Sequence, residues 1–398
     1  MTHPHDEVRR ITDQLVTKKI SRRDFVRRAG ELGVSMPLIS AILAACGVGP
    51  ASSGSSTPSL AGSQPASGRQ LVVASWGSSF GIAQRDVQFD PFTEETGIEI
   101  VLASQQPEMA LIEQQVSSGR VEWDLAEHAN TNAFTMANRD LLEKIDYASM
   151  DPAIVDGIDP AVRSDFSCGI FYIGLALGYN TSFFTADNHP RSWADFWDAG
   201  AFPAPRGLTT MDFDPPPLEV PLLAAGVSKD ALYPLDLDAA FASLDVVKPN
   251  ITKWLGFEVD GNQLLAQGEL GVISAAVGNL INATREGQPV DIEWNEQLIN
   301  YDAWVVPKGA PHKEDAMKFI EFCMRPDIQA NFAAAYPGGP VVAAAWDSIS
   351  QEVRDVSVSS PEHIENSVVV DAEWWTTVED GKTNLERVFE RWAEWFVS

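Results

Sequence analysis

From residue 70 onward the chain alternates short apolar runs with longer segments of helical periodicity, and this alternation constrains the fold more than any other feature. The two helical segments nearest its start end at Gly97 and Gly119, the position where a glycine commonly closes a helix. Strand–helix alternation predicts an α/β architecture. The expected elements of this part are strands at 70–75, 98–104 and 123–126 and helices at 82–96 and 108–118.

The same pattern continues through the second half of the chain. Ser192 is a candidate N-cap for a helix, and an amphipathic helix is expected at 313–324. From residue 384 to the end, large apolar side chains recur at helical spacing, which favours core packing over a partner surface. Continuous apolar runs predict buried strands at 170–179, 207–211, 271–276 and 303–307.

The first 45 residues have the organisation of an export signal. A basic stretch ends at Arg22 and Arg23, an uncharged apolar run covers 32–45, and the motif LAAC ends at Cys46. The run is shorter than the roughly 20 residues of a membrane-spanning helix. This order predicts a twin-arginine lipoprotein signal, with lipid attached to Cys46 after cleavage. The alternative is an amphipathic helix of a cytoplasmic protein with an ordinary cysteine.

The segment 47–69 consists almost entirely of Gly, Ser, Ala and Pro and cannot bury a core. We interpret 46–69 as a lipidated cysteine and a flexible tether that spans about 25–30 Å. The protein is therefore expected outside the cytoplasm, anchored to a membrane only through lipid.

Charge and cysteine content exclude some functions. Without residues 1–45 the chain has 20 Lys and Arg against 51 Asp and Glu, a formal charge of −31. Such a surface repels nucleic acid and anionic lipid, and it suits solubility outside the cell. Cys168 and Cys323 lack metal-ligand spacing, and two buried thiols are favoured over a disulfide.

In open α/β sheets, ligands bind beyond the carboxyl ends of the strands. Polar or aromatic residues follow or border several of the expected strands. The positions selected by this rule are 76–79, which include Trp76, Ser78 and Ser79; 127–130, an expected polar turn that includes His128 and Asn130; 212–219; Asn279; and the segment around Asp302.

Several strings resemble the spermidine/putrescine type of extracellular solute-binding protein, over some 250 residues and in the family's order. They are VVASWG at 72–77, PFTEETGI at 91–98, GYNT at 178–181 followed by SWAD at 192–195, and DAWVVPKGA at 302–310 with AMKFI at 316–320.

The resemblance implies a two-lobed periplasmic-binding-protein-like fold of type II, with the ligand in the cleft between the lobes and capture by hinge closure. It implies a monomer that binds a small molecule, needs no cofactor or metal and delivers its ligand to an ABC permease and ATPase. The expected divisions are lobe 1 at 70–169 and 301–345, lobe 2 at 170–300, and helices packing on the lobes at 346–398.

The family's ligand residues carry over only in part. Trp76 and Tyr336 match aromatic residues of the cleft, and Glu219 and Asp302 match acidic ones. Ser78 and Asn279 stand where a carboxylate is often found, and these two departures reduce the negative charge of the site. The lower charge favours a smaller or zwitterionic cation. The expected ligand is a polyamine such as putrescine or spermidine, or a related amine. An amino-acid conjugate or opine is the alternative.

Carboxylates and aromatic rings suit an amine because each desolvated ammonium needs a counter-charge, and cation–π contact adds about 0.5–2 kcal/mol. Each residue also has a structural alternative. Trp76 is compatible with core packing, Glu219 with a helix N-terminus, and Asp302 with a hydrogen bond at the hinge. Tyr336 is compatible with packing of a turn, and His128 with a solvent-facing position.

The sequence lacks the motifs of the alternative functions that we considered. The chain has no G-x-S-x-G elbow, H-E-x-x-H zinc pair or Walker loop, so we expect no catalytic residues, although a carboxylate pair is chemically able to act as acid and base. A ferric-iron binder of this fold would cluster its tyrosines, and this chain has only six, scattered. A sensory or adhesive lipoprotein that binds a solute without transport stays open.

Overall fold

The computed structural model describes residues 69–211, 215–256 and 261–398, which belong to one compact unit, Ala66–Ser398. The predicted export signal with Arg22 and Arg23, the lipidation site Cys46 and nearly all of the tether lie outside these residues, as do positions 212–214. Among the described helices, none is long and apolar enough to cross a membrane.

A ten-stranded mixed sheet runs through the described body and supports both lobes. The strands follow one another across the sheet in the order β2-β1-β3-β8-β4-β7-β5-β6, with β9 paired to β4 and β10 paired to β8. This arrangement confirms the predicted two-lobed α/β fold. The bounds are β1 Gln70–Ala74, β2 Glu99–Leu102, β3 Leu125–Ala129, β4 Ser167–Asn180, β5 Arg206–Thr209, β6 Ile251–Leu255, β7 Val272–Ala276, β8 Val290–Val305, β9 Gly339–Pro340 and β10 Val368–Val369.

The first lobe is built on the parallel strands β1, β2 and β3. The predicted helix 82–96 is two α-helices joined by a π-helical turn at Arg85–Phe89, and Gly97 and Gly119 close α5 and α6 in the left-handed conformation, as expected. Its core contains the rings of Phe92 and Phe319. The helices are α4 Ser78–Gln84, α5 Asp90–Thr96, α6 Met109–Ser118, α7 Asn130–Asn138, α8 Pro152–Gly157, α14 Lys313–Cys323 and α15 Pro326–Ala335.

The second lobe is built on the parallel strands β5, β6 and β7. Ser192 caps α9 as predicted, because its hydroxyl accepts a hydrogen bond from the Asp195 backbone N–H. Trp193, Phe196 and Trp375 are fully buried in its core. The helices are α9 Trp193–Trp197, α10 Glu219–Ala224, α11 Leu237–Val247, α12 Gly261–Ala266 and α13 Val277–Arg285.

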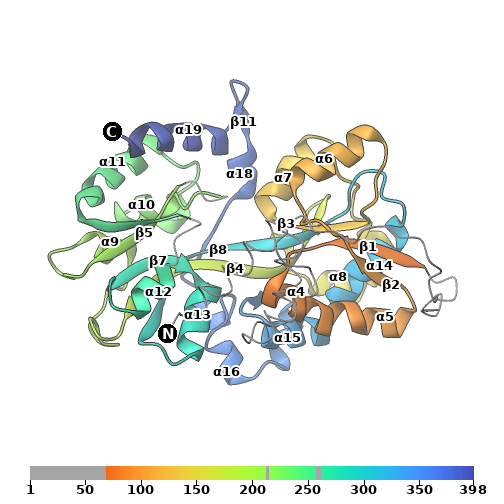
Figure 1. Cartoon of the computed structure of the whole chain (residues 1–398), viewed down its shortest axis with the longest axis horizontal. Helices are drawn as coiled ribbons and strands as arrows, with labels where there is room; N and C mark the ends of the chain where they lie inside the picture. Colours follow the sequence, from red (N-terminus) through yellow and green to blue (C-terminus); the bar gives the residue numbers. More distant parts are fainter. Residues whose placement is uncertain (1–68, 212–214, 257–260) are drawn as a thin grey trace, which may run out of the picture. The chain divides into compact units, whose positions relative to one another are not determined.

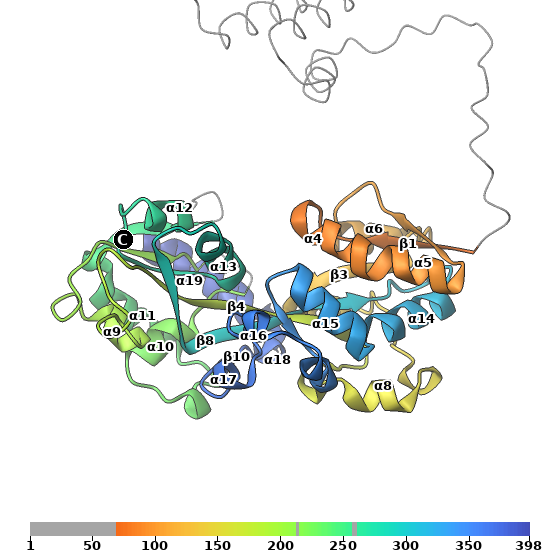
Figure 2. The same cartoon turned by 90° about the horizontal axis from the view of Figure 1, so that it is seen from below.

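Two long antiparallel strands, β4 and β8, connect the lobes. Both Figure 1 and Figure 2 show them side by side between the two groups of elements. The apolar run at 303–307 revealed only the end of β8, because residues 291–296 are half-buried and mostly polar and so form no apolar run. The connection between the lobes thus runs through this strand pair.

The C-terminal segment packs on both lobes. Helix α19 (Asn384–Phe396) begins with a capping box between Thr383 and Glu386, and it buries Val388 and Trp392 in the core of the second lobe, as expected. Helix α18 (Ala372–Thr376) inserts Trp375 into the same core and also packs against α7 of the first lobe (Figure 1). The remaining elements are α16 Gln351–Arg354, α17 Pro361–Ile364, β11 Val378–Glu379 and β12 Lys382–Thr383.

The two cysteines of the described body are buried and unpaired. Cys168 lies on β4, and Cys323 is the last residue of α14. The prediction of buried thiols in place of a disulfide is confirmed.

Candidate functional site

Two carboxylates lie on one face of the sheet, where β3 meets β8. Asp302 of β8 is directly opposite Ala129 of β3, and Trp304 is opposite Glu127. Because opposite residues and residues two apart share a face, the side chains of Glu127 and Asp302 lie on the same side of the sheet. Glu127 has no exposed surface. We call these two residues the acid pair.

The acid pair has hydrogen-bond donors but no counter-charge within the described residues. The Ser75 hydroxyl donates to Glu127 Oε2 at 2.8 Å, and Gln84 Nε2 donates to the same oxygen at 3.2 Å. Glu127 Oε1 is buried and has no hydrogen-bond partner among these residues. The acid pair is therefore partly satisfied and not neutralised.

Burial and mutual repulsion disfavour two negative charges here. Burial raises the pKa of Asp302 to about 7. Burial and then repulsion by Asp302 raise the pKa of Glu127, against the opposing effect of the hydrogen bonds from Ser75 and Gln84. A cation brought to the acid pair would remove this repulsion and favour the ionised carboxylates.

An aromatic cluster that includes Tyr336 stands beside the acid pair, and Trp76 follows one of its hydrogen-bond donors in the chain. Burial and then the charges of Asp302 and Glu127 raise the pKa of Tyr336. Phe171 is opposite Asp302 on β4 and packs on the Tyr336 ring. The Tyr336 ring packs on Phe80 and Phe171 with centroids 5.0 and 5.8 Å away. Trp76 follows Ser75 in the chain and is 39% exposed, so it is not a core residue. The structure thus brings two sequence-predicted residues, Asp302 and Tyr336, into one cluster.

A cavity of about 180 Å³ lies next to the acid pair, on the side of the second lobe. Asn300 of β8 lines it and is opposite Ile173 of β4, while Asp302 is opposite Phe171. Asn300 and Asp302 are therefore neighbours on the same face of β8. The rest of the lining is mostly apolar and comprises Ile173, Gly174, Leu175, Thr209, Pro215, Pro216, Pro217, Glu219, Ala276, Leu298 and Val370.

Glu219 begins α10 at the wall of this cavity, has no exposed surface and is anchored in the core. The Tyr233 hydroxyl and the Trp375 indole N–H, the latter at 3.1 Å, both donate to its Oε1. Its Oε2 has no hydrogen-bond partner among the described residues. Burial raises the pKa of Glu219, against the opposing effect of these hydrogen bonds.

The expected polar turn at 127–130 is wrong, because residues 127–129 continue β3 and Asn130 begins α7. His128 consequently points to the face opposite Glu127 and is 2% exposed, and burial lowers its pKa to about 4. Burial raises the pKa of Tyr301 to about 12, and a hydrogen bond with Asn130 opposes that rise. The structure does not bring His128 or Asn130 together with the acid pair.

The remaining predicted site residues lie at the N-termini of α4 and α13. Ser78 and Ser79 are the first residues of α4, and their side chains lie outside the described part of the structure. Asn279 is the third residue of α13. A Cβ atom on its neighbour Gly278 would lie 3.5 Å from the carbonyl oxygen of Pro337, which follows Tyr336. The start of α13 therefore contacts the segment that carries Tyr336.

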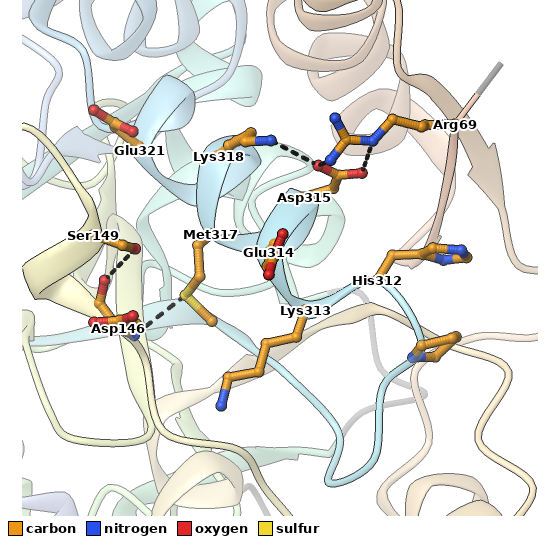
Figure 3. A pocket seen from close by; sticks show the side chains of 11 residues that line it. Arg69, Asp146, Ser149, His312, Lys313, Glu314, Asp315, Met317, Lys318 and Glu321 are labelled. Carbon is orange, nitrogen blue, oxygen red and sulfur yellow. Dashed lines mark hydrogen bonds and ion pairs between the residues drawn. The ribbon is translucent and has the colours of Figure 1, made fainter.

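A larger surface cavity, of about 730 Å³, lies elsewhere on the first lobe, around the start of α14. Figure 3 shows Arg69 and Lys318 directed at Asp315, and both form ion pairs with it. Lys313 is paired with Glu143 at 2.9 Å. Because most of its charges already have partners, this cavity is a weaker ligand site than the acid pair and its neighbouring cavity.

Sequence reasoning did not single out Ser75, Gln84 or Asn300. It selected Glu127 only as a member of the run 127–130 that follows an expected strand. Asn300 lies in a strand of mixed polarity and gave no signal of its own. Among the described residues, no group of three His, Cys, Asp or Glu side chains is placed to hold a metal ion.

Comparison with known proteins identifies the family of this chain. The model of the bacterial extracellular solute-binding protein family matches residues 88–357. A gamma-aminobutyric acid-binding protein of Pseudomonas aeruginosa is 32% identical over 84% of this chain and 94% of its own length. The spermidine/putrescine-binding periplasmic protein of Escherichia coli is 22% identical over 76% of this chain and 86% of its own.

Among solved structures, a GABA receptor is 30% identical, covers 82% of this chain and 97% of its own, and superposes with a TM-score of 0.72. The resemblance to solute-binding proteins is confirmed, and the polyamine-binding relative is the more distant of the two relatives above. The chain belongs to the bacterial extracellular solute-binding protein family and is the substrate-binding component of an ABC importer.

Proposed function

We propose that this protein captures a small solute with a primary ammonium group, and that the ammonium binds at the acid pair of Glu127 and Asp302. The observation that carries the proposal is the acid pair itself, two carboxylates on one face of the sheet without a counter-charge in the described body. Desolvated carboxylates of this kind are costly unless a cation neutralises them.

The aromatic residues suit the same ligand. Trp76 and Tyr336 offer ring faces to an ammonium or its methylene neighbours, and cation–π contact adds about 0.5–2 kcal/mol. Closure of the lobes about β4 and β8 would remove the ammonium from water, which strengthens its attraction to the acid pair. The closed form would then be presented to the permease, from a protein that we propose is exported, monomeric and held to the membrane through Cys46.

The relatives support the class of ligand and do not decide among its members. Gamma-aminobutyric acid, spermidine and putrescine, the solutes named for the two relatives above, all carry a primary ammonium group. The shared ammonium is therefore the part of the ligand that we propose first, and the polyamine assignment from the sequence is one member of this wider class.

Calorimetric titration of the purified protein tests the proposal. The ligands are GABA, putrescine, spermidine, lysine and an opine, and butyrate serves as the match of GABA without an ammonium. We expect at least one amine to bind and butyrate to show no binding. The bound amine should be recovered chemically unchanged. Asp302→Asn should weaken binding about 30-fold or more, since removing one partner of a buried charge pair costs about 2–5 kcal/mol.

The matched control is Asp230→Asn, which removes one negative charge from an exposed position of the second lobe and should leave affinity unchanged. Equal affinity of the parent and Asp302→Asn for the same amine would overturn the role of the acid pair. Binding of butyrate as tightly as GABA would overturn the ammonium as the recognised group. A chemical product from the bound amine would favour an enzyme.

A further inference from the structure

Asn300 lines the cavity, and its amide oxygen is already held by the backbone. Its Oδ1 accepts a hydrogen bond from the Tyr301 backbone N–H at 2.9 Å. A backbone N–H is a donor only, so this bond identifies the oxygen and leaves the NH₂ group on the other branch of the amide. The side chain lines the cavity, and its Nδ2 forms no hydrogen bond with any described residue. Asn300 therefore offers unused donors to whatever enters the cavity.

The other polar groups of the cavity offer a ligand no exposed carboxylate. Glu219 has no exposed surface, and its Oε1 is held by Tyr233 and Trp375. The Thr209 hydroxyl is already used, because it donates to the Ser274 carbonyl at 3.1 Å. No Lys or Arg is among the described residues that line the cavity. A ligand group is thus met by neutral hydrogen-bond donors and by apolar surface.

The distance between the two subsites is set by the strand. Asn300 and Asp302 are two residues apart on one face of β8, about 6.5 Å along the strand. Ile173 is opposite Asn300, and Leu175 is opposite Leu298, farther from Asp302 on the same face, so the surroundings of Asn300 are apolar. The spacing of Asp302 and Asn300 and these apolar surroundings fit a short aliphatic chain with an ammonium at one end and a hydrogen-bond acceptor at the other.

Resting on the proposed function, we infer that Asn300 determines specificity by recognising the end of the ligand away from the ammonium, and that this end is a carboxylate. The ligand is then a linear ω-amino acid and not a diamine. A diamine would place its second ammonium against the NH₂ group of Asn300, where donors meet a donor and no exposed carboxylate of the described lining residues pairs with the desolvated charge.

Affinities for three chain-matched ligands test this inference: GABA has both ends, butylamine has only the ammonium, and putrescine has two ammonium groups. The parent should prefer GABA to either amine by about tenfold or more, the range of a hydrogen bond to a charged group. Asn300→Asp should reverse the order of GABA and putrescine, because the new carboxylate repels one ligand and pairs with the other. Asn300→Ala should reduce the advantage of GABA over butylamine without a gain for putrescine.

Asn282→Asp is the matched control, since it adds the same charge at an exposed position of α13 and should leave the order of the three ligands unchanged. Circular dichroism and thermal unfolding check that each variant folds. If Asn300→Asp does not fold, the comparison of GABA with butylamine in Asn300→Ala decides the question on its own.

The two proposals fail in different ways. A parent that binds putrescine more tightly than GABA, or Asn300 variants that keep the parent's order of ligands, would overturn the role of Asn300 and leave ammonium capture standing. A parent that binds none of the amines in the calorimetric panel would overturn ammonium capture, and the specificity inference with it.

Discussion

The acid pair of the first lobe and Glu219 of the second lobe are both carboxylates withdrawn from water, and their surroundings differ. Glu219 accepts hydrogen bonds from Tyr233 and Trp375, two core residues whose polar atoms would otherwise lack that acceptor. Glu127 likewise accepts two hydrogen bonds on one oxygen and none on the other, and its donors are Ser75 and Gln84, but it also repels Asp302. Glu219 stabilises the fold without a ligand. Glu127 and Asp302, in contrast, are stabilised in their ionised forms when a cation binds beside them. Burial alone therefore does not identify a binding carboxylate.

The largest effect that we expect from this comparison is on stability. Glu219→Ala should lower the free energy of unfolding by about 2–4 kcal/mol, because it strands the Tyr233 hydroxyl and the Trp375 N–H in the core and leaves a cavity. Glu127→Gln, in contrast, should leave the unliganded protein at least as stable as the parent, since it removes the repulsion with Asp302. Urea titration monitored by circular dichroism measures both. If both changes lowered the free energy of unfolding equally, the conclusion that Glu219 stabilises the fold and Glu127 does not would be wrong.

The second effect is a dependence on pH that belongs to the acid pair. The folded protein holds a proton at Asp302 up to about pH 7, whereas the unfolded chain releases it near pH 4. The contribution of Asp302 to stability is therefore fully present below pH 4 and is lost as the pH rises to 7. A bound ammonium favours the ionised carboxylate, so affinity should rise over the same interval, by up to about tenfold per pH unit for one released proton.

Titrations at pH 6 in buffers of different ionisation enthalpy measure the proton released on binding. The Asp302→Asn protein should lose most of the pH dependence of its residual affinity. An affinity that falls between pH 5 and pH 7 would contradict the assignment of this titration to Asp302.

The smallest effect is expected at the exposed aromatic residue. Trp76→Ala should weaken amine binding by about 2–30-fold, the range of a cation–π contact, with little change in stability because the side chain is 39% exposed. Trp76→Phe should recover part of the affinity. If Trp76→Ala binds the amine as tightly as the parent, the aromatic contribution comes from Tyr336 alone.

Local signals predicted much of the fold. Glycines 97 and 119, the Ser192 cap and the apolar stripe of α19 lie where the sequence placed them, because each acts through neighbours close in the chain. The run 127–130 looked like a turn because it is polar. Pairing with β8, a partner more than 170 residues away, holds its first three residues in β3.

The same reason explains what the sequence revealed of the site. Asp302 and Tyr336 were found through a resemblance that covers most of the body. Glu127 and Asn300 become meaningful only when the register of β8 against β3 and β4 is known. A slip of one residue would turn both side chains to the other face, and no local pattern specifies a register between distant strands.

Helix α18 has a mechanical consequence for the exterior of the molecule. Trp375 fixes it to the core of the second lobe, while its surface rests on α7 of the first. Rotation of the lobes about β4 and β8 would make α18 slide along α7 and change the surroundings of Trp374, which packs against Tyr233 with ring centroids 5.6 Å apart. Intrinsic tryptophan fluorescence would then change when the lobes close. The surface formed by α18 and α7 would therefore differ between the liganded and the unliganded protein.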